Sequence, residues 1–86
     1  MIDFTATWCP PCRKIGPIYE AMAAKYPEVT LKKIDVDKNK EAARAAGVQA
    51  MPTFKVWVGG QEYDMLRGAN EAKLTEMLER AKEMNG

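Results

Sequence analysis

Two adjacent prolines, Pro10 and Pro11, constrain the fold of this chain more than any other feature of its sequence. A proline has no backbone N–H, so it interrupts a strand ladder or a helix interior. The first turn of a helix tolerates it, because the amides there have no partner within the helix. The two prolines therefore predict that a helix begins at Pro10 and that any strand before it has ended.

The segments on both sides of the prolines fit this prediction. Residues 1–6 alternate between apolar and polar side chains, which is typical of a short strand with unlike faces. From Pro10 to about Lys25, apolar side chains follow one another at spacings of three and four, the pattern of an amphipathic helix. The side chains that form this apolar stripe are Ile15, Ile18, Met22 and Tyr26.

The middle of the chain predicts a second strand and a short helix. Residues 29–36 are mostly β-branched and apolar, as in a strand. Asn39 is suited to cap a helix over residues 40–46, and Gly47 supplies its C-terminal stop. This segment therefore repeats the strand and helix of the first one.

The last third of the chain predicts a hairpin and a final helix. Residues 53–58 and 61–66 flank Gly59-Gly60, a two-residue loop that permits positive φ angles. Asn70 is placed to cap the final helix. The apolar side chains of that helix are Leu74, Met77, Leu78 and Ala81.

The predicted order is strand, helix, strand, helix, strand, strand, helix (βαβαββα), an α/β fold. A strand–helix–strand start implies a right-handed parallel crossover, and the hairpin adds antiparallel strands. We therefore expect a four-stranded mixed sheet with helices on both faces. The chain has 86 residues, is 47% hydrophobic and contains no linker or repeat, so residues 1–86 should form a single domain.

Charge and hydropathy exclude several classes of partner. The 13 Lys and Arg nearly balance the 12 Asp and Glu, and a net charge of +1 would not attract nucleic acid or anionic lipid. No apolar run approaches the roughly 20 residues of a membrane span, and the start lacks the zones of a signal peptide. We expect a cytoplasmic protein, bound to neither nucleic acid nor membrane, that recognises its partners through a local patch.

Cys9 and Cys12, the two cysteines, stand three positions apart. Two are too few for the disulfide framework of a secreted mini-protein, but they are typical of a redox or metal-binding pair. Disulfide exchange needs one thiolate with a lowered pKa and a second thiol that resolves the mixed disulfide. At the N-cap, the Cys9 sulfur would face the positive end of the helix dipole. We therefore expect an accessible Cys9 to attack and a more buried Cys12 to resolve.

The prolines also bear on this chemistry. Neither Pro10 nor Pro11 has an N–H, so the Cys12 amide is left as the main backbone donor to a Cys9 thiolate, which limits how far its pKa can fall. Pro11 also disfavours the helical region for Pro10, so the dipeptide should be stiff. We expect both prolines to tune the reduction potential of the pair.

Several short motifs follow one another along the chain: DFTATWC at residues 3–9, CRK at 12–14, Pro17, DVD at 35–37, AMPTF at 50–54 and RGAN at 67–70. In this order and at these spacings they resemble the thioredoxin family over nearly the whole chain. The resemblance implies a thioredoxin-like fold and a protein-disulfide reductase without a bound cofactor. Its partners would be disulfide-containing proteins and an external reductase, such as an NADPH-dependent thioredoxin reductase.

The resemblance also implies a docking surface for substrates. Pro52 would be cis and lie beside the cysteine pair, with the Met51 backbone offered to an extended segment of the substrate. Trp8 would flank the reactive sulfur as part of an apolar surface. Gly68 and Ala69 would lie near the rim of that surface.

Asp3 matches the family position of a buried carboxylate that exchanges a proton with the resolving cysteine. Its neighbours Ile2 and Phe4 place it in the middle of a strand, where burial would raise its pKa toward the range of a general acid–base catalyst. Lys33 matches a position where some relatives carry a lysine near that carboxylate, although we expect it to be solvated. Asp3 is therefore the third predicted catalytic residue.

Two features depart from the family pattern. Pro10 stands where thioredoxins usually have glycine, and Cys-Pro-Pro-Cys is more similar to nucleoredoxins and tryparedoxins. The chain also lacks the strand and helix that usually precede its first strand, so it resembles a minimal version of the fold. Their absence would leave residues 29–36 as an edge strand beside uncovered apolar surface, and we expect lower stability or weak self-association.

Two other functions remain as alternatives at this point. Two thiolates supply half of a tetrahedral metal site and the chain has no histidine, so a zinc ion or iron–sulfur cluster would require a dimer that shares it through both cysteine pairs. We predict no metal ligands within one chain. The second alternative is a redox-silent protein-binding module that uses only the surface around Trp8 and Pro52.

Overall fold

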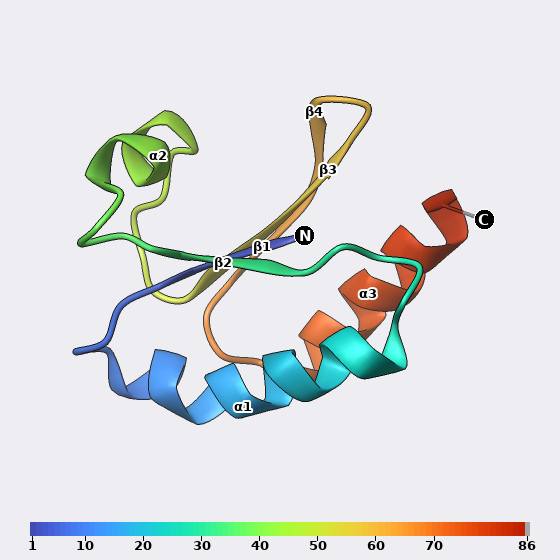
Figure 1. Ribbon diagram of the computed structural model, residues 1–86, viewed down its shortest axis with the longest axis horizontal. Helices are drawn as coiled ribbons and strands as arrows, with labels where there is room; N and C mark the ends of the chain where they lie inside the picture. The colour runs from blue at the N-terminus through green and yellow to red at the C-terminus, as the bar shows by residue number, and fades with distance from the viewer. Residues whose placement is uncertain (86) are drawn as a thin grey trace.

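The computed structural model describes residues 1–85 and has the predicted order of elements, βαβαββα (Figure 1). Gly86, the last residue of the predicted domain, lies outside the described residues. The elements are β1 (Ile2–Thr5), α1 (Pro10–Lys25), β2 (Lys32–Asp35), α2 (Lys40–Ala45), β3 (Thr53–Val58), β4 (Gln61–Arg67) and α3 (Glu71–Asn85).

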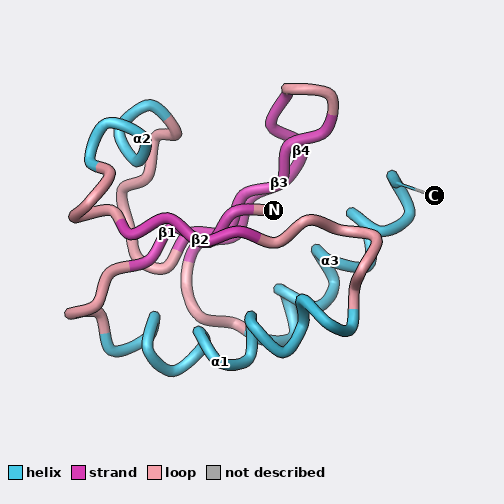
Figure 2. Tube along the Cα trace, in the orientation of Figure 1, coloured by secondary structure: helices cyan, strands magenta, loops and turns pink. Residues whose placement is uncertain are grey.

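The four strands form one mixed sheet in the order β2-β1-β3-β4. β1 runs parallel to β2 and antiparallel to β3, and β3 pairs antiparallel with β4. Figure 2 shows α1 as the crossover between the two parallel strands. β2 is shorter than the predicted strand over 29–36, because the Val29 amide bonds back to the Tyr26 carbonyl in a turn at 3.1 Å. The predicted mixed sheet is confirmed, with β2 at one edge.

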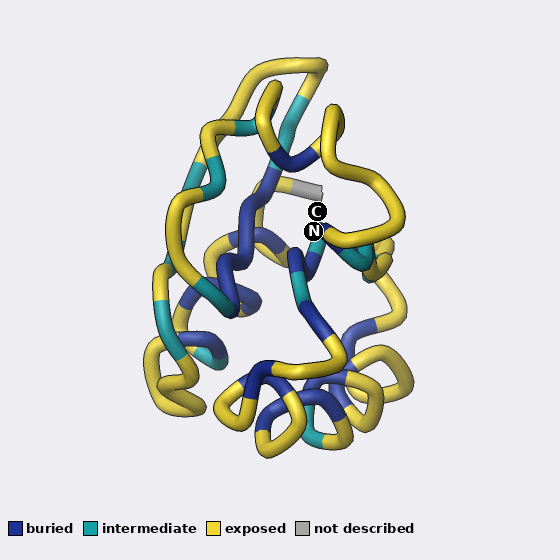
Figure 3. The backbone as a smooth tube through the Cα atoms, turned by 90° about the vertical axis from the view of Figure 1, so that its left-hand side faces the viewer, coloured by how far each residue is buried: buried dark blue, intermediate teal, exposed yellow. Residues whose placement is uncertain are grey.

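Helices cover both faces of the sheet, as predicted: α1 and α3 lie on one side and α2 on the other (Figure 1). Each face has its own apolar core, and buried segments lie along β1 and β3 and recur along the helices (Figure 3). The core under α1 and α3 is built mainly from Ile15, Tyr19, Met22, Phe54, Val56, Leu74, Met77 and Leu78. The core on the other face contains Phe4, Ala6, Val36, Ala43 and both cysteines.

The turn signals of the sequence act as predicted in three places. Gly59 and Gly60 form the β3–β4 loop with φ angles of 60° and 82°. Gly47 ends α2 with a φ of 72°, a left-handed conformation that favours glycine. Asn70 caps α3, because its Oδ1 accepts the Lys73 amide N–H at 3.0 Å.

The prediction that the Asn39 side chain caps α2 is wrong. Asn39 occupies the N-cap position of α2 but its side chain makes no capping hydrogen bond. Its Nδ2 instead donates to the carbonyl oxygen of Asp35 at 3.3 Å. The Asp35 carboxylate also accepts the Asp37 amide at 2.9 Å. The turn that ends β2 therefore binds the side chain that the sequence assigned to the helix.

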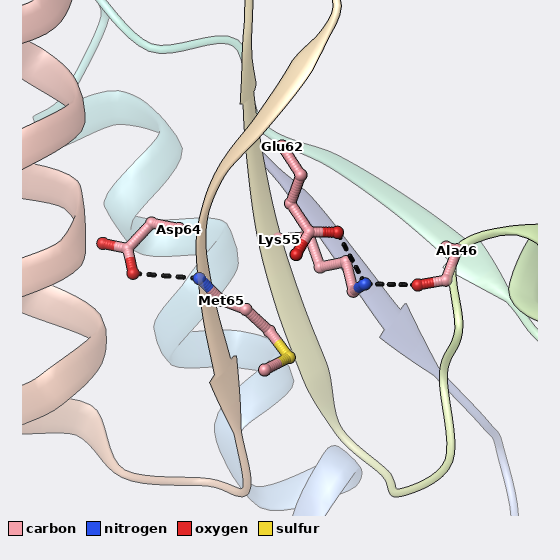
Figure 4. Close-up of polar contacts among 5 residues, drawn as sticks. All are labelled: Ala46, Lys55, Glu62, Asp64 and Met65. Carbon is pink, nitrogen blue, oxygen red and sulfur yellow. Dashed lines mark hydrogen bonds and ion pairs between the residues drawn. The ribbon is translucent and has the colours of Figure 1, made fainter.

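Lys55 is a buried cation in the middle of β3, 6% exposed. Its ammonium donates to the carbonyl oxygen of Ala46, at the C-cap of α2, and to Glu62 Oε1 on β4 at 2.7 Å (Figure 4). A buried charge is tolerated when such partners replace its hydration. Lys55 thus fastens the end of α2 to the sheet, just before the segment 47–51 that leads to Pro52.

Leu74 offers a test of the core under α1 and α3, because its side chain is fully buried. We expect Leu74→Ala to lower the free energy of unfolding by about 2–5 kcal/mol, since the neighbours cannot fill the cavity completely. Met84→Ala, on the same helix at a residue 49% exposed, should change it by less than about 0.5 kcal/mol. Urea unfolding of the oxidised proteins measures both values, and similar losses would contradict this core.

Candidate active site

The candidate site forms where β1 ends and α1 begins. The Cys9 amide donates to the Ala6 carbonyl at 3.2 Å and closes a turn after β1. Cys9 has an extended conformation at the N-cap of α1, and its carbonyl accepts the Arg13 amide at 3.1 Å. The predicted helix start at Pro10, with prolines in the first two helical positions, is confirmed.

Cys9 and Cys12 are joined as a disulfide, with their Cα atoms 5.2 Å apart. This separation lies within the usual range for a disulfide. The Cys12 amide N–H donates to Cys9 Sγ at 3.3 Å. Pro10 and Pro11 are exposed and contribute no N–H, so the backbone donor expected from the sequence is the one found.

The expectation of an accessible Cys9 above a more buried Cys12 is wrong for this structure, because both residues are 3% exposed. The turn to Ala6 folds Cys9 back toward the sheet. Both cysteines pack in the core cluster that contains Phe4 and Val36. The two residues therefore differ in their position on the helix and in hydrogen bonding, but not in burial.

Trp8 lies just before the pair and is 63% exposed. Its indole Nε1 donates to Asp37 Oδ2 at 2.7 Å, across 29 positions of sequence. This bond fixes a large apolar side chain that would otherwise move freely in solvent. Sequence reasoning missed Asp37, although it belongs to the DVD motif at 35–37.

The segment before β3 lies close to the cysteines. The Met51–Pro52 peptide bond is cis, as the resemblance implied. Met51 is half-buried and packs against the cluster that contains both cysteines. The Pro52 carbonyl accepts the Gly68 amide at 2.8 Å, which brings Gly68 and the exposed Ala69 next to this segment. Gly68 has a φ of 96°, which explains why glycine occupies the position.

Asp3 is 1% exposed, and its Oδ1 has no hydrogen-bond partner. Loss of hydration on burial raises the pKa of this carboxyl from 3.8 to about 6, and the positive charge of Lys33 opposes the rise. Lys33 is paired with Asp3 in strand register but forms an ion pair with Glu20, Nζ to Oε1 at 2.5 Å. The sequence predicted the buried carboxyl but not this ion pair.

A cavity of about 330 Å³ lies beside Cys12. Thr5, Cys12, Glu20 and Lys33 are among its lining residues. Because alternate residues of a strand share a face, Asp3 projects from the same face of β1 as Thr5. Cys12 and the Lys33–Glu20 pair therefore meet at one cavity, on the side of the sheet where Asp3 is buried.

Within residues 1–85, no group of three or more His, Cys, Asp or Glu side chains is arranged to hold a metal ion. No helix in this part of the chain is long and apolar enough to cross a membrane.

Comparison with known proteins decides the family. The family model described as Thioredoxin matches residues 1–80. This chain belongs to the thioredoxin family. It is 49% identical over 83 residues to a thioredoxin of Geodia cydonium, a match that covers 95% of this chain and 78% of that protein. The sequence resemblance is thereby confirmed, and with its Cys9–Cys12 pair this thioredoxin-family protein is a thiol–disulfide oxidoreductase.

Solved structures support the same fold. The X-ray structure of Fasciola hepatica thioredoxin matches with a TM-score of 0.90 and 52% identity, covering 92% of this chain and 76% of that one. Plasmodium falciparum thioredoxin matches with a TM-score of 0.89 and 39% identity, covering 92% and 81%. The thioredoxin-like α/β fold is therefore confirmed.

The buried Asp3 carboxyl makes stability depend on pH. Because folding raises its pKa from 3.8 to about 6, both states hold the proton below about pH 4, and stability falls between about pH 4 and pH 6, where the unfolded state has lost the proton and the folded state still holds it. The cost reaches about 3 kcal/mol above that range. We expect Asp3→Asn to remove it, so the stability of the variant relative to the parent should rise by up to that amount between pH 4 and pH 8.

Urea unfolding of the oxidised proteins at both pH values measures this change. Glu83→Gln removes one negative charge from an exposed position of α3 and serves as the control. A difference between Asp3→Asn and the parent that does not change with pH would contradict the raised pKa.

Proposed function

We propose that this protein reduces disulfides in other proteins, with Cys9 as the nucleophile and Cys12 as the resolving thiol. The observation that carries the proposal is the hydrogen bond from the Cys12 amide to Cys9 Sγ at the N-cap of α1. A donated N–H and the positive end of a helix dipole both stabilise a thiolate relative to a thiol. The Cys12 sulfur lies one turn further along and lacks the N-cap position.

The reaction then has two exchange steps. The Cys9 thiolate attacks one sulfur of a substrate disulfide, a Cys9–substrate bond forms, and the first substrate sulfur leaves as a thiolate. Cys12 loses its proton and attacks Cys9 Sγ, which breaks the mixed disulfide and releases the second substrate thiolate. Two electrons pass to the substrate, and the Cys9–Cys12 disulfide remains.

Asp3 is the proposed acceptor of the Cys12 proton. A carboxyl whose pKa is raised to about 6 holds and releases protons near neutral pH, as a general acid–base catalyst must. Its Oδ1 is buried without a hydrogen-bond partner, so no hydrogen bond to this oxygen stabilises the ionised carboxylate. The cavity beside Cys12 gives solvent access to this region.

The proposed docking surface consists of Trp8, Met51, Pro52, Gly68 and Ala69. The exposed Trp8 ring gives apolar contact at one side of the cysteine pair. The segment that contains Met51 packs against the cysteine cluster, and its backbone is suited to pair with an extended substrate chain. Pro10 and Pro11 are proposed to tune the reduction potential by stiffening the first turn of α1.

Turnover requires partners. The substrates are proteins with accessible disulfides, and an external reductase, such as an NADPH-dependent thioredoxin reductase, returns electrons to the cysteine pair without a cofactor bound to this chain. A compartment that keeps thiols reduced, such as the cytoplasm, suits this direction of exchange.

The roles of the two cysteines are tested by trapping. Cys12→Ser should accumulate a mixed disulfide at Cys9, because the second exchange step is blocked, and mass spectrometry of the captured species identifies the bond. Cys9→Ser should abolish both capture and insulin reduction. Capture by Cys9→Ser at Cys12 would reverse the assignment, and partner binding that survives loss of both cysteines would favour the redox-silent module.

The uncovered face near α2 predicts weak self-association. β2 is an edge strand, and a hollow of about 280 Å³ opens beside it, so pairing of two copies would bury apolar surface. The exposed Lys32 and Lys33 on the edge strand would oppose close pairing. The hollow is lined by Ile2, Phe4, Ile34, Ala42, Ala45, Ala46 and Trp57.

Sedimentation over a range of protein concentrations measures this association. We expect a monomer at low concentration and a growing dimer fraction at high concentration. A monomer at every concentration would contradict the expectation.

A further inference from the structure

We propose that Glu20 is a positioning residue that holds the Lys33 ammonium away from Asp3 and thereby sets how readily Asp3 takes up a proton. The proposal rests on the proposed function in one respect, since it gives this proton a role in catalysis only if Asp3 accepts it from Cys12.

Strand register places Lys33 within reach of Asp3. The two residues are Cα partners in the parallel pair β1–β2, and partners in neighbouring strands project from the same face of the sheet about 5 Å apart. A lysine side chain is long enough to bring its ammonium to a carboxylate at that separation. Nevertheless, Lys33 Nζ binds Glu20 Oε1 at 2.5 Å, and Asp3 Oδ1 is left without a partner. The Lys33 ammonium can therefore pair with either of two carboxylates, that of Asp3 or that of Glu20.

The cavity beside Cys12 links the pairing of Lys33 to the proposed proton transfer from Cys12. Glu20 reaches the cavity from α1 and Lys33 reaches it from β2, and Cys12 contributes to the same lining. An ammonium paired with Glu20 sits at the exposed side of this region, because 42% of the Lys33 side chain and 64% of the Glu20 side chain are exposed. Movement of the ammonium to Asp3 would place a positive charge beside the proposed proton acceptor.

Other charged or titratable groups lie around Asp3 or line the cavity beside Cys12. Tyr19 on α1 adds no positive charge near Asp3, because its hydroxyl is neutral and donates to the Lys32 carbonyl oxygen at 2.8 Å. Cys12 and Arg13 of α1 line the cavity, and Phe54, the β3 partner of Asp3, is apolar. Lys55 is a buried cation, but its ammonium is bound to the Ala46 carbonyl and Glu62.

The sign of the effect follows from charge. A cation near a carboxylate favours its ionised form and lowers its pKa. Neutralising Glu20 releases Lys33, so the pKa of Asp3 should fall and Asp3 should become a weaker base. The shift should be modest, because ion pairs between partly exposed side chains are screened by water and salt.

The experiment is an NMR titration of the Asp3 side-chain carboxyl carbon in the oxidised protein. We expect Glu20→Gln to lower the pKa of Asp3 by about half a unit, an approximately 3-fold loss of proton affinity. Adding Glu20→Gln to a Lys33→Met protein should produce no further shift, because the lysine that carries the effect is gone. Glu83→Gln, a matched loss of charge at an exposed site of α3, should leave the pKa unchanged.

Two results would overturn the proposal. One is an unchanged Asp3 pKa in Glu20→Gln. The other is an equal shift in the presence and absence of Lys33, which would mean that the Glu20 charge acts on Asp3 directly. The pH profile of insulin reduction separates this proposal from the proposed function. In Glu20→Gln, a shifted Asp3 pKa with an unchanged pH profile of insulin reduction would support the proposal that Glu20 positions Lys33. It would reject the proposal that Asp3 is the proton acceptor.

Discussion

The hydrogen bond from the Cys12 amide to Cys9 Sγ depends on the exact residue at which α1 begins, and the rest of the site depends on that start. Pro10 and Pro11 favour this start, because the first turn of a helix tolerates proline best; Pro17, inside α1, shows that a later position is not forbidden. A start one residue later would remove Cys9 from the N-cap and separate its sulfur from this donor. The same start ends β1 at Thr5 and leaves Asp3 in the strand interior.

Two ionisable residues are buried on the sheet, and their surroundings give them different roles. The Lys55 ammonium has both a carbonyl and a carboxylate as partners, so its charge is compensated and it serves to hold α2 in place. Asp3 has an oxygen with no partner, and burial raises its pKa to about 6. Partners compensate the buried charge of Lys55, whereas burial raises the pKa of the Asp3 carboxyl.

The sequence predicted most of the architecture because its strongest signals are local. The prolines located the start of α1, Gly59 and Gly60 located the hairpin, and Asn70 located the start of α3. Each acts through its own backbone or within one turn of it. The element order and the mixed sheet followed from these signals and from the apolar periodicity.

The features that sequence reasoning missed depend on contacts between distant segments. Trp8 and Asp37 are 29 positions apart, and the residues next to either of them in sequence do not predict their hydrogen bond. The ion pair of Glu20 with Lys33 joins α1 to β2 across the crossover. The burial of Cys9 depends on how the turn after β1 packs against the sheet, which local patterns do not specify. The docking and catalytic roles in the site came from the family resemblance and from chemistry rather than from periodicity.

We propose that the start of α1 at Pro10 stabilises the Cys9 thiolate relative to the thiol. Alkylation of the reduced protein by iodoacetamide over a range of pH, with the modified cysteine identified by mass spectrometry, tests it most directly. We expect Cys9 to react first, with an apparent pKa below the roughly 8.5 of a free cysteine, and Cys12 to react much more slowly. Preferential alkylation of Cys12, or equal rates with an unperturbed pKa at both positions, would contradict the account.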